Sequence, residues 1–202
     1  MMKKKRLTAE QRRISIIEAT IQVVAKLNYD RATTALIAKE AKINQALIYK
    51  HFKSKAQLQI AMLDHIRGIM SKNYDSNPEL AKEVKKTSFF QAITAQYHSS
   101  LKAEVLLRAC VVKAMVAIDP KIRAKAWEIV KENHEFLRTS LEQDYRSKAG
   151  HAEFDAEMMA WSVFASDILF TSLSLMGKMD EVSKEKIFES VQYSEKMLFG
   201  IE

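Results

Sequence analysis

The chain of 202 residues has few of the residues that break regular structure: only 4 are glycine and 2 are proline. Architectures made of many short strands and tight turns depend on both residue types, so they are disfavoured. No segment sustains the apolar–polar alternation of a half-buried strand. Because 48% of the residues are hydrophobic, the chain is globular and long enough to bury a substantial core. The composition predicts an all-α fold.

Cysteine is scarcer still, since Cys110 is the single thiol and cannot form an intrachain disulfide. This fits the reducing cytoplasm. Residues 1–13 are basic but are followed by no apolar core, so they are not a signal peptide. The most apolar run, residues 160–176, contains Asp167 and several serines, and it is too short and too polar for a membrane span. We expect a cytoplasmic protein.

Motifs of catalysis are missing as well. The five histidines fall in different expected helices or loops, and the sequence has no cysteine–histidine cluster, glycine-rich phosphate loop or nucleophile elbow. Cys110 lies among apolar residues, which favours a core position over a redox sensor. We expect no enzyme activity, no metal and no cofactor. An enzyme housed in the helical part of the chain stays open as an alternative.

Positive charge is concentrated in the first quarter of the chain. Residues 1–55 carry 13 Lys or Arg against 4 Asp or Glu, a net charge of +9, whereas the other residues carry 19 against 21. A field of this sign at one end indicates a nucleic-acid partner. A basic amphipathic membrane helix is the competing interpretation. The charges bracket a motif and do not line one helical face, which favours DNA.

That motif is Thr33–Leu58, which predicts two short helices joined by a tight turn. Thr34 is expected to cap the first helix, with Ile37, Ala38 and Ala41 facing inward, and Asn44 is expected to cap the second, which ends near His51. The second helix would bury Ile48 and leave its outer face free to enter a DNA groove. A capping box at Ser54 and Gln57 then predicts a third helix.

A set of positions in the same stretch fits one family signature without a gap. These positions are Thr33, Thr34, Ile37, Ala38, Ala41, Ile43, Asn44, Ile48, Tyr49, His51, Phe52, Ser54, Lys55 and Leu58. The set resembles the N-terminal signature of the TetR family of transcriptional regulators. Asn28 and Lys42 depart from it, because the family commonly has Gly there, and Asn44 stands where Ser is common. Lys42 predicts a strained or differently shaped turn.

The resemblance and the geometry of the motif together assign DNA contacts. Base contacts are expected from Gln45, Ala46 and Leu47, since glutamine pairs with adenine and small apolar side chains pack on the thymine methyl. Tyr49 lies on the same outer face and is expected to meet a base edge as well. Phosphate contacts are expected from Thr34, Tyr49, His51 and Lys55, with Asn44 at the start of the helix. Lys3, Lys4, Lys5 and Arg6 are expected to add contacts as an N-terminal arm.

The chain is expected to comprise about nine helices in two domains: a helix-turn-helix DNA-binding domain at 1–52, and a helical effector-binding and dimerisation domain at 53–202. Helix one follows a capping box at Thr8 and Gln11 and ends near Asn28. The later helices are expected at about 54–73, 88–101, 103–118, 120–147, 152–177 and 183–198. The structure of 74–87 is left open by the sequence.

The last two expected helices have apolar residues on more than one face, which indicates burial on two sides. In the TetR family these helices form the homodimer interface. The residues expected there are Met158, Trp161, Ile168, Leu169, Leu175, Ile187, Val191 and Leu198. A symmetric dimer would present two reading heads to a palindromic operator. A monomer with a thick core is the alternative.

Aromatic and methionine side chains in the helical domain suit a cavity for a small, largely apolar ligand. The candidates are Phe89, Phe90, Tyr97, Arg108, Met115, Trp127, His134, Trp161 and Phe164. For each of them, ordinary core packing is the competing interpretation. Arg108, Lys113 and Asp167 are charges inside apolar stretches that need partners if buried.

The predicted function is that of a repressor released from its operator when a ligand moves the helix that begins at Ser54. A DNA-bound structural or cell-division protein, which recruits a protein partner without an effector, is the alternative on the same fold. The sequence does not distinguish repressor from activator.

Overall fold

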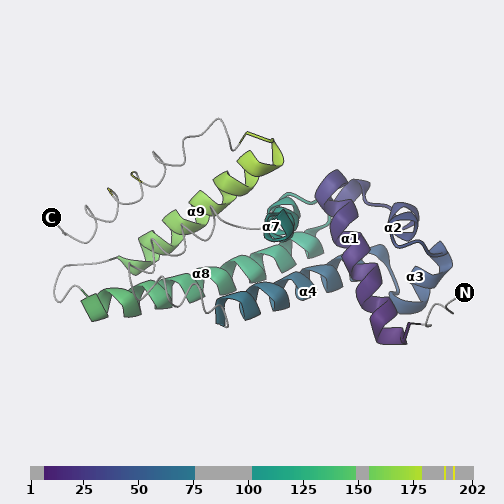
Figure 1. Ribbon diagram of the computed structural model, residues 1–202, viewed down its shortest axis with the longest axis horizontal. Coiled ribbons are helices and arrows are strands. Elements are labelled where there is room, and N and C mark those ends of the chain that lie inside the picture. The colour runs from purple at the N-terminus through teal and green to yellow at the C-terminus, as the bar shows by residue number, and fades with distance from the viewer. Residues whose placement is uncertain (1–6, 76–101, 149–154, 179–188, 190–192, 194–202) are drawn as a thin grey trace, which may run out of the picture. The chain divides into compact units, whose positions relative to one another are not determined.

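Seven helices and no strand make up the described part of the computed structural model, which comprises residues 7–75, 102–148, 155–178, 189 and 193 (Figure 1). The helices are α1 (Ala9–Arg31), α2 (Thr34–Glu40), α3 (Gln45–His51), α4 (Lys55–Asp75), α7 (Lys102–Met115), α8 (Pro120–Lys148) and α9 (Ala156–Leu175). The all-α prediction is confirmed for these residues. The helices expected at 88–101 and 183–198 fall outside them, apart from residues 189 and 193, so the count of nine stays a prediction.

The chain divides into two compact units. One contains Met1–Met70 with Leu106–Glu128, and the other contains Ser71–Val105 with Ile129–Glu202. The first unit therefore joins the three N-terminal helices to most of α4, to α7 and to the start of α8. The domain boundary expected after residue 52 rests on the motif and remains a prediction.

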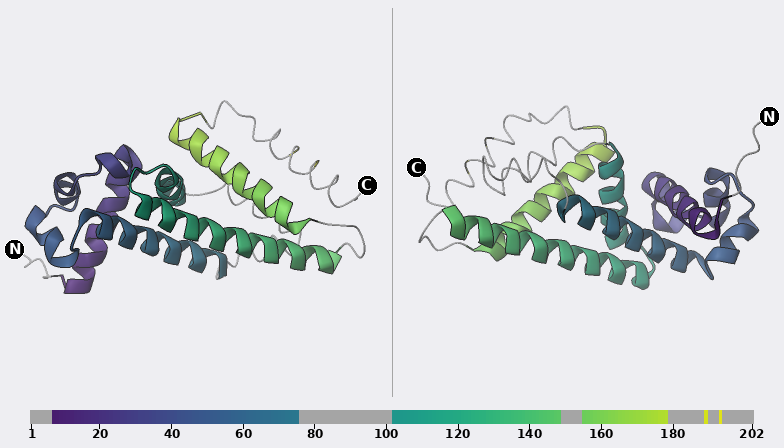
Figure 2. Two further views of the ribbon diagram at one scale, coloured as in Figure 1. Left: turned by 180° about the vertical axis from the view of Figure 1, so that it is seen from behind. Right: turned by 60° about the horizontal axis from the view of Figure 1, so that its bottom comes forward.

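Helices α1, α2 and α3 form the head of the first unit, which is seen from two further directions in Figure 2. The Thr8 hydroxyl accepts from the Gln11 amide at 3.2 Å while the Gln11 side chain accepts from the Thr8 amide at 3.0 Å, so the predicted capping box is confirmed. Ile37 and Ile48 are fully buried between the helices. The core of the head is therefore the one that the apolar spacing predicts.

Caps define the two helices of the motif. The Asn44 carboxamide accepts from the Ala46 amide at 2.8 Å, as predicted. The cap of α2, however, is Thr33, whose hydroxyl accepts from the Leu36 amide at 3.2 Å. The prediction that Thr34 caps this helix is wrong, because Thr34 already belongs to the helix and its side chain is buried. This shift leaves the Thr34 hydroxyl available for contacts with α3.

α1 is interrupted at Asn28, whose φ of 71° lies in the left-handed region. Asparagine tolerates this conformation better than most residues. The interruption brings the next residue, Tyr29, into the core, where it is 1% exposed. The Tyr29 hydroxyl donates to the Cys110 carbonyl of α7 at 3.0 Å, and its own carbonyl accepts from the Gln59 side chain of α4 at 2.8 Å. Tyr29 therefore connects three helices.

The predicted starts of the later helices hold in part. Asp119 accepts from the Lys121 amide at 2.8 Å and precedes Pro120 at the first position of α8, which agrees with the expected helix start at about 120. α9 begins later than predicted, at Ala156, because Asp155 caps it by accepting from the Met158 amide at 2.9 Å. Gly177 follows its end with a φ of 66°, which is the left-handed conformation that glycine permits.

Cys110 is fully buried, and burial raises the pKa of its thiol to about 12. A thiol reacts as its thiolate, so a raised pKa and a lack of access both suppress reaction. We expect the folded protein at pH 8 to be inert to a thiol-specific disulfide reagent and to release one equivalent of thiolate in denaturant. Rapid reaction in the folded state would contradict the buried position and restore the redox-sensor interpretation.

Tyr29→Phe is expected to lower the free energy of unfolding by about 1 kcal/mol, since it deletes one buried hydrogen bond and leaves the ring in place. Urea denaturation followed by circular dichroism measures the change. Tyr193→Phe is the matched control, because Tyr193 is 66% exposed. Equal stability of the two variants would show that the bond to Cys110 contributes nothing.

Candidate nucleic-acid interface and effector site

The outer face of α3 consists mainly of residues expected to contact DNA. Asn44, Gln45 and Ala46 are exposed, and Tyr49 keeps 51% of its surface accessible. Leu47 is half-buried, so less of its side chain is available than the sequence predicts. With Ile48 turned into the core, the other face of the helix carries the packing. One face of the helix thus packs on the core while the other is exposed, as a DNA-recognition helix requires.

Three of the residues expected to contact DNA, Thr34 on α2 and Gln45 and Tyr49 on α3, form a hydrogen-bonded network that the sequence does not predict. The Gln45 Nε2 group donates to the Thr34 hydroxyl at 2.7 Å. The same hydroxyl lies 3.2 Å from the Tyr49 hydroxyl, and either group can donate. Gln45 and Tyr49 are one turn apart on α3, a spacing visible in the sequence. Thr34 is 11 residues from Gln45, and only the packing of α2 on α3 brings it to them.

His51 and Lys55 are both half-buried, and each is held from α1. The His51 carbonyl accepts from the Arg13 guanidinium at 3.3 Å, and that guanidinium also lies 4.4 Å from the centre of the buried Phe52 ring. The Lys55 ammonium donates to the Asp30 carbonyl at 3.0 Å. These contacts fix the C-terminal end of α3 against α1. Lys3, Lys4, Lys5 and Arg6 lie outside the described residues.

The turn between α2 and α3 keeps the left-handed geometry for which glycine is common. Lys42 adopts a φ of 54°, which costs an L-residue roughly 1–2 kcal/mol. The expected strain is therefore present, and the turn retains the geometry that glycine would adopt. The backbone amide of Ile43 closes the turn by donating to the Ala38 carbonyl at 3.0 Å.

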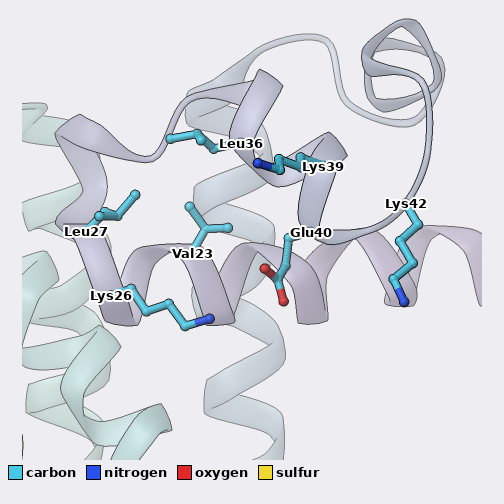
Figure 3. A pocket seen from close by; sticks show the side chains of 7 residues that line it. All are labelled: Val23, Lys26, Leu27, Leu36, Lys39, Glu40 and Lys42. Atoms are coloured by element: carbon cyan, nitrogen blue, oxygen red, sulfur yellow. The ribbon is translucent and has the colours of Figure 1, made fainter.

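A surface pocket of about 380 Å³ opens beside this turn, between α1 and α2 (Figure 3). Its lining residues are Val23, Lys26, Leu27, Leu36, Lys39, Glu40 and Lys42. In Figure 3 the apolar side chains of Val23, Leu27 and Leu36 lie between the two helices. None of the lining residues belongs to the predicted effector set, so this pocket is a feature of the head alone.

Three of the predicted effector residues cluster in the second unit. The His134 ring on α8 stacks on the Trp161 ring of α9 with centroids 4.1 Å apart, and Phe164 meets Trp161 edge-on at 6.1 Å. The Trp161 Nε1 group donates to Glu157 at 3.0 Å, and the same carboxylate oxygen lies 3.5 Å from the His134 Nε2 atom. His134 is buried, whereas Trp161 keeps 38% of its surface. The cluster therefore has an accessible aromatic edge.

The remaining effector candidates are not seen to join this cluster. Arg108, Met115 and Trp127 belong to the first unit, where Trp127 is 50% exposed and the other two are half-buried. Phe89, Phe90 and Tyr97 lie outside the described residues. His134 thus has a packing role, and the predicted ligand contacts of the whole set stay a prediction.

Lys113, one of three charges noted inside apolar stretches, has a structural partner. Its ammonium donates to the Ala25 carbonyl on α1, just before the interruption at Asn28. Carbonyls at such an interruption lack helical donors, so a lysine from α7 supplies one. This carbonyl is the kind of partner that a charge inside an apolar stretch needs. Asp167 is buried on α9 in the second unit.

α9 exposes much of the apolar surface assigned to the dimer. Met158, Leu169 and Leu175 are between 44% and 57% exposed, and Ile168 is half-buried. The expectation that this run is too short and too polar for a membrane span is not met: by length and composition, Ala156–Leu175 is apolar enough to cross a membrane, although its buried face includes Asp167 and Thr171. A partner helix would cover such a surface equally well. Ile187, Val191 and Leu198 lie outside the described residues.

Comparison with known proteins identifies the head. Residues 16–62 match the sequence model of the family described as bacterial regulatory proteins, tetR family. This match covers α2, α3, most of α1 and the start of α4, which are the elements that build the exposed reading helix. A comparison with curated protein sequences finds no significant match.

Solved structures extend the likeness to nearly the whole chain. Salmonella enterica GusR has a TM-score of 0.75 at 18% identity, covering 97% of this chain and all of the other (100%). FadR from Bacillus subtilis, in complex with stearoyl-CoA, has a TM-score of 0.69 at 19% identity, covering 94% and 99%. The multidrug binding protein EbrR, complexed with malachite green, has a TM-score of 0.62 at 17% identity, covering 91% and 97%. With the fold shared along its length and the family sequence present in its head, the chain is a helix-turn-helix transcription regulator of the TetR family.

Proposed function

We propose that the protein is a cytoplasmic homodimeric repressor that binds a palindromic operator and releases it when a small, largely apolar ligand binds the second unit. The observation that carries the DNA-binding part is the outer face of α3, where Gln45, Ala46 and Tyr49 are exposed on a helix anchored by Ile48. The positive charge of the first 55 residues would add the sequence-independent affinity for phosphates.

The dimer is supported by the exposed apolar side chains of α9. Large apolar side chains rarely gather on the surface of a monomer unless they form an interaction site. Met158, Leu169 and Leu175 are such side chains on one helix. Two copies packed through α9 would carry two heads, and a spacing of about one DNA turn, roughly 34 Å, would fit a palindrome.

The effector is proposed to bind at the aromatic cluster of His134, Trp161 and Phe164. Flat aromatic surfaces suit apolar organic molecules. FadR with stearoyl-CoA and EbrR with malachite green support the idea that this fold accommodates organic ligands. The class of ligand is therefore proposed as organic and largely apolar, without a preferred charge.

A route from ligand to head runs through side chains that join the helices. α8 carries His134 and, nearer its start, Lys125, whose ammonium lies 2.8 Å from Asp64 of α4. α4 in turn holds the head through Gln59 and the Tyr29 carbonyl. The hydrogen bonds that Tyr29 and Lys113 make between α1 and α7 add a second connection to the head. The proposed mechanism therefore includes movement of α7 as well as of α4. The ligand would shift the population toward a conformation with lower operator affinity.

Selection of bound fragments from genomic DNA, read by sequencing, tests the function. We expect the purified protein to enrich one palindromic motif at a few promoters. Gln45→Ala should relax the preference at one position of each half-site by about 1–3 kcal/mol, because alanine cannot hydrogen-bond the base. Glu189→Gln, an exposed change outside the first unit, should leave the motif unchanged and serves as the control.

Each outcome of that selection has a distinct meaning. A motif without two-fold symmetry would contradict reading by a symmetric dimer. Many scattered sites away from promoters would favour the structural DNA-binding protein. The absence of any enriched sequence would contradict operator binding altogether.

Salt dependence tests the contribution of the N-terminal lysines. Deleting residues 3–6 should flatten the fall of log K with log salt by about 0.9 for each phosphate that the protein no longer neutralises, and the selected motif should stay the same. Fluorescence anisotropy over a salt series measures the slope, with Lys131→Gln on the exposed side of α8 as the control. A changed motif would instead show that these residues read bases or groove width.

A further inference from the structure

The network of Gln45, Thr34 and Tyr49 has a hydrogen-bonding direction that bears on base recognition. In the part of the chain that the structure describes, the bond to Thr34 is the one hydrogen bond of the Gln45 side chain. It uses an N–H of the amide, so the carbonyl oxygen and the second N–H remain available. Because Gln45 is exposed, these two groups are not sealed in the core and can meet a ligand.

The direction is fixed once Tyr49 contacts a phosphate. A phosphate oxygen only accepts, so the Tyr49 hydroxyl must donate its proton to it. The Tyr49 oxygen, 3.2 Å from the Thr34 hydroxyl, can then only accept from Thr34. Thr34 has a single proton, and with that proton committed to Tyr49 it can only accept from Gln45. The Gln45 amide is thereby held with its nitrogen toward Thr34.

We propose that Tyr49 and Thr34 act as a positioning relay that makes Gln45 present its carbonyl oxygen to the DNA and select a base with an amino group in the major groove. This inference rests on the proposed function, in which the head reads an operator. Adenine and cytosine carry such a donor, whereas guanine and thymine present only acceptors there. Adenine suits the site best, because its N7 atom accepts from the second N–H of Gln45.

The relay gives Thr34 a role that its burial would not suggest. With 7% of its surface exposed, Thr34 makes a poor direct phosphate contact, although the sequence predicted one. Its hydroxyl acts instead through Gln45. Without the hydroxyl, the amide can turn over and donate to the O6 and N7 atoms of guanine. Thr34 therefore governs specificity at one base position while touching no base.

The test compares selection from random DNA by the full-length wild type with selection by Thr34→Val, Thr34→Ser, Tyr49→Phe and Gln45→Ala. Gln45→Ala identifies the position that Gln45 reads. At that position Thr34→Val should lose roughly tenfold of the discrimination against guanine, and Tyr49→Phe should lose it in the same direction. Thr34→Ser keeps the hydroxyl and should keep the wild-type preference. All other positions should stay unchanged.

Binding constants for operators with adenine or guanine at this position convert the selection into affinity ratios. Thermal unfolding checks that each variant is folded, and Thr34→Ala replaces Thr34→Val if the valine is not accommodated. A wild type that enriches no motif would overturn the proposed function. A wild-type motif that Thr34→Val leaves unchanged, or one with guanine preferred at the Gln45 position, would overturn the relay alone. The relay would also be overturned if Gln45→Ala left the base preference unchanged at every position of the motif.

Discussion

The first unit depends on Tyr29, a large side chain buried where α1, α4 and α7 meet. Its hydroxyl donates to a carbonyl of α7, and its carbonyl accepts from Gln59 of α4. Burying these polar groups without partners would cost free energy, so the three helices must meet with their donors and acceptors aligned. The aromatic ring adds the area that stabilises the junction. The position of the head relative to α4 and α7 within this unit is thus set by a specific group of bonds.

The interruption of α1 makes this arrangement possible, and it also affects the backbone hydrogen bonds of α1. A residue with positive φ at Asn28 turns the chain so that Tyr29 faces inward, but it also leaves carbonyls of the preceding turn without helical donors. The Lys113 ammonium donates to the Ala25 carbonyl, and the Cys110 thiol lies 3.7 Å from the Ile21 carbonyl. Several hydrogen bonds therefore join α7 to α1. A helix held in this way is well suited to pass a displacement to the head.

Local features of the fold follow from the sequence, and long-range features do not. The capping box at Thr8, the cap at Asn44 and the buried Ile48 involve neighbours within four residues, so spacing alone predicts them. The error at Thr34 is local as well, since two adjacent threonines offer the same capping chemistry. By contrast, Tyr29 and Cys110 are 81 residues apart, and nothing in their surroundings pairs them. Lys113 could be noticed as a charge in an apolar run, but the carbonyl it meets could not.

The same distinction separates the two candidate sites. The exposed face of α3 could be predicted because one short segment supplies it, whereas the aromatic cluster needs α8 and α9 to meet. The Thr34 network lies between these cases. Its two members on α3 share a face by helical periodicity, and the third requires the packing of α2. A sequence can therefore indicate which side chains share the exposed face of α3 before it indicates how they are oriented.

The short length of α3 explains why orientation matters so much. A helix of seven residues is not stable by itself in water, so its geometry must come from its surroundings. Ile48 and Phe52 anchor it in the core, and Arg13 of α1 holds its last carbonyl. These contacts position the backbone of the helix, but they leave the exposed Gln45 amide free to rotate. A hydrogen bond from the neighbouring helix is the remaining means of fixing that amide, and Thr34 supplies it. In the proposed relay, precision at a base edge depends on a buried hydroxyl as much as on the exposed side chain that it directs.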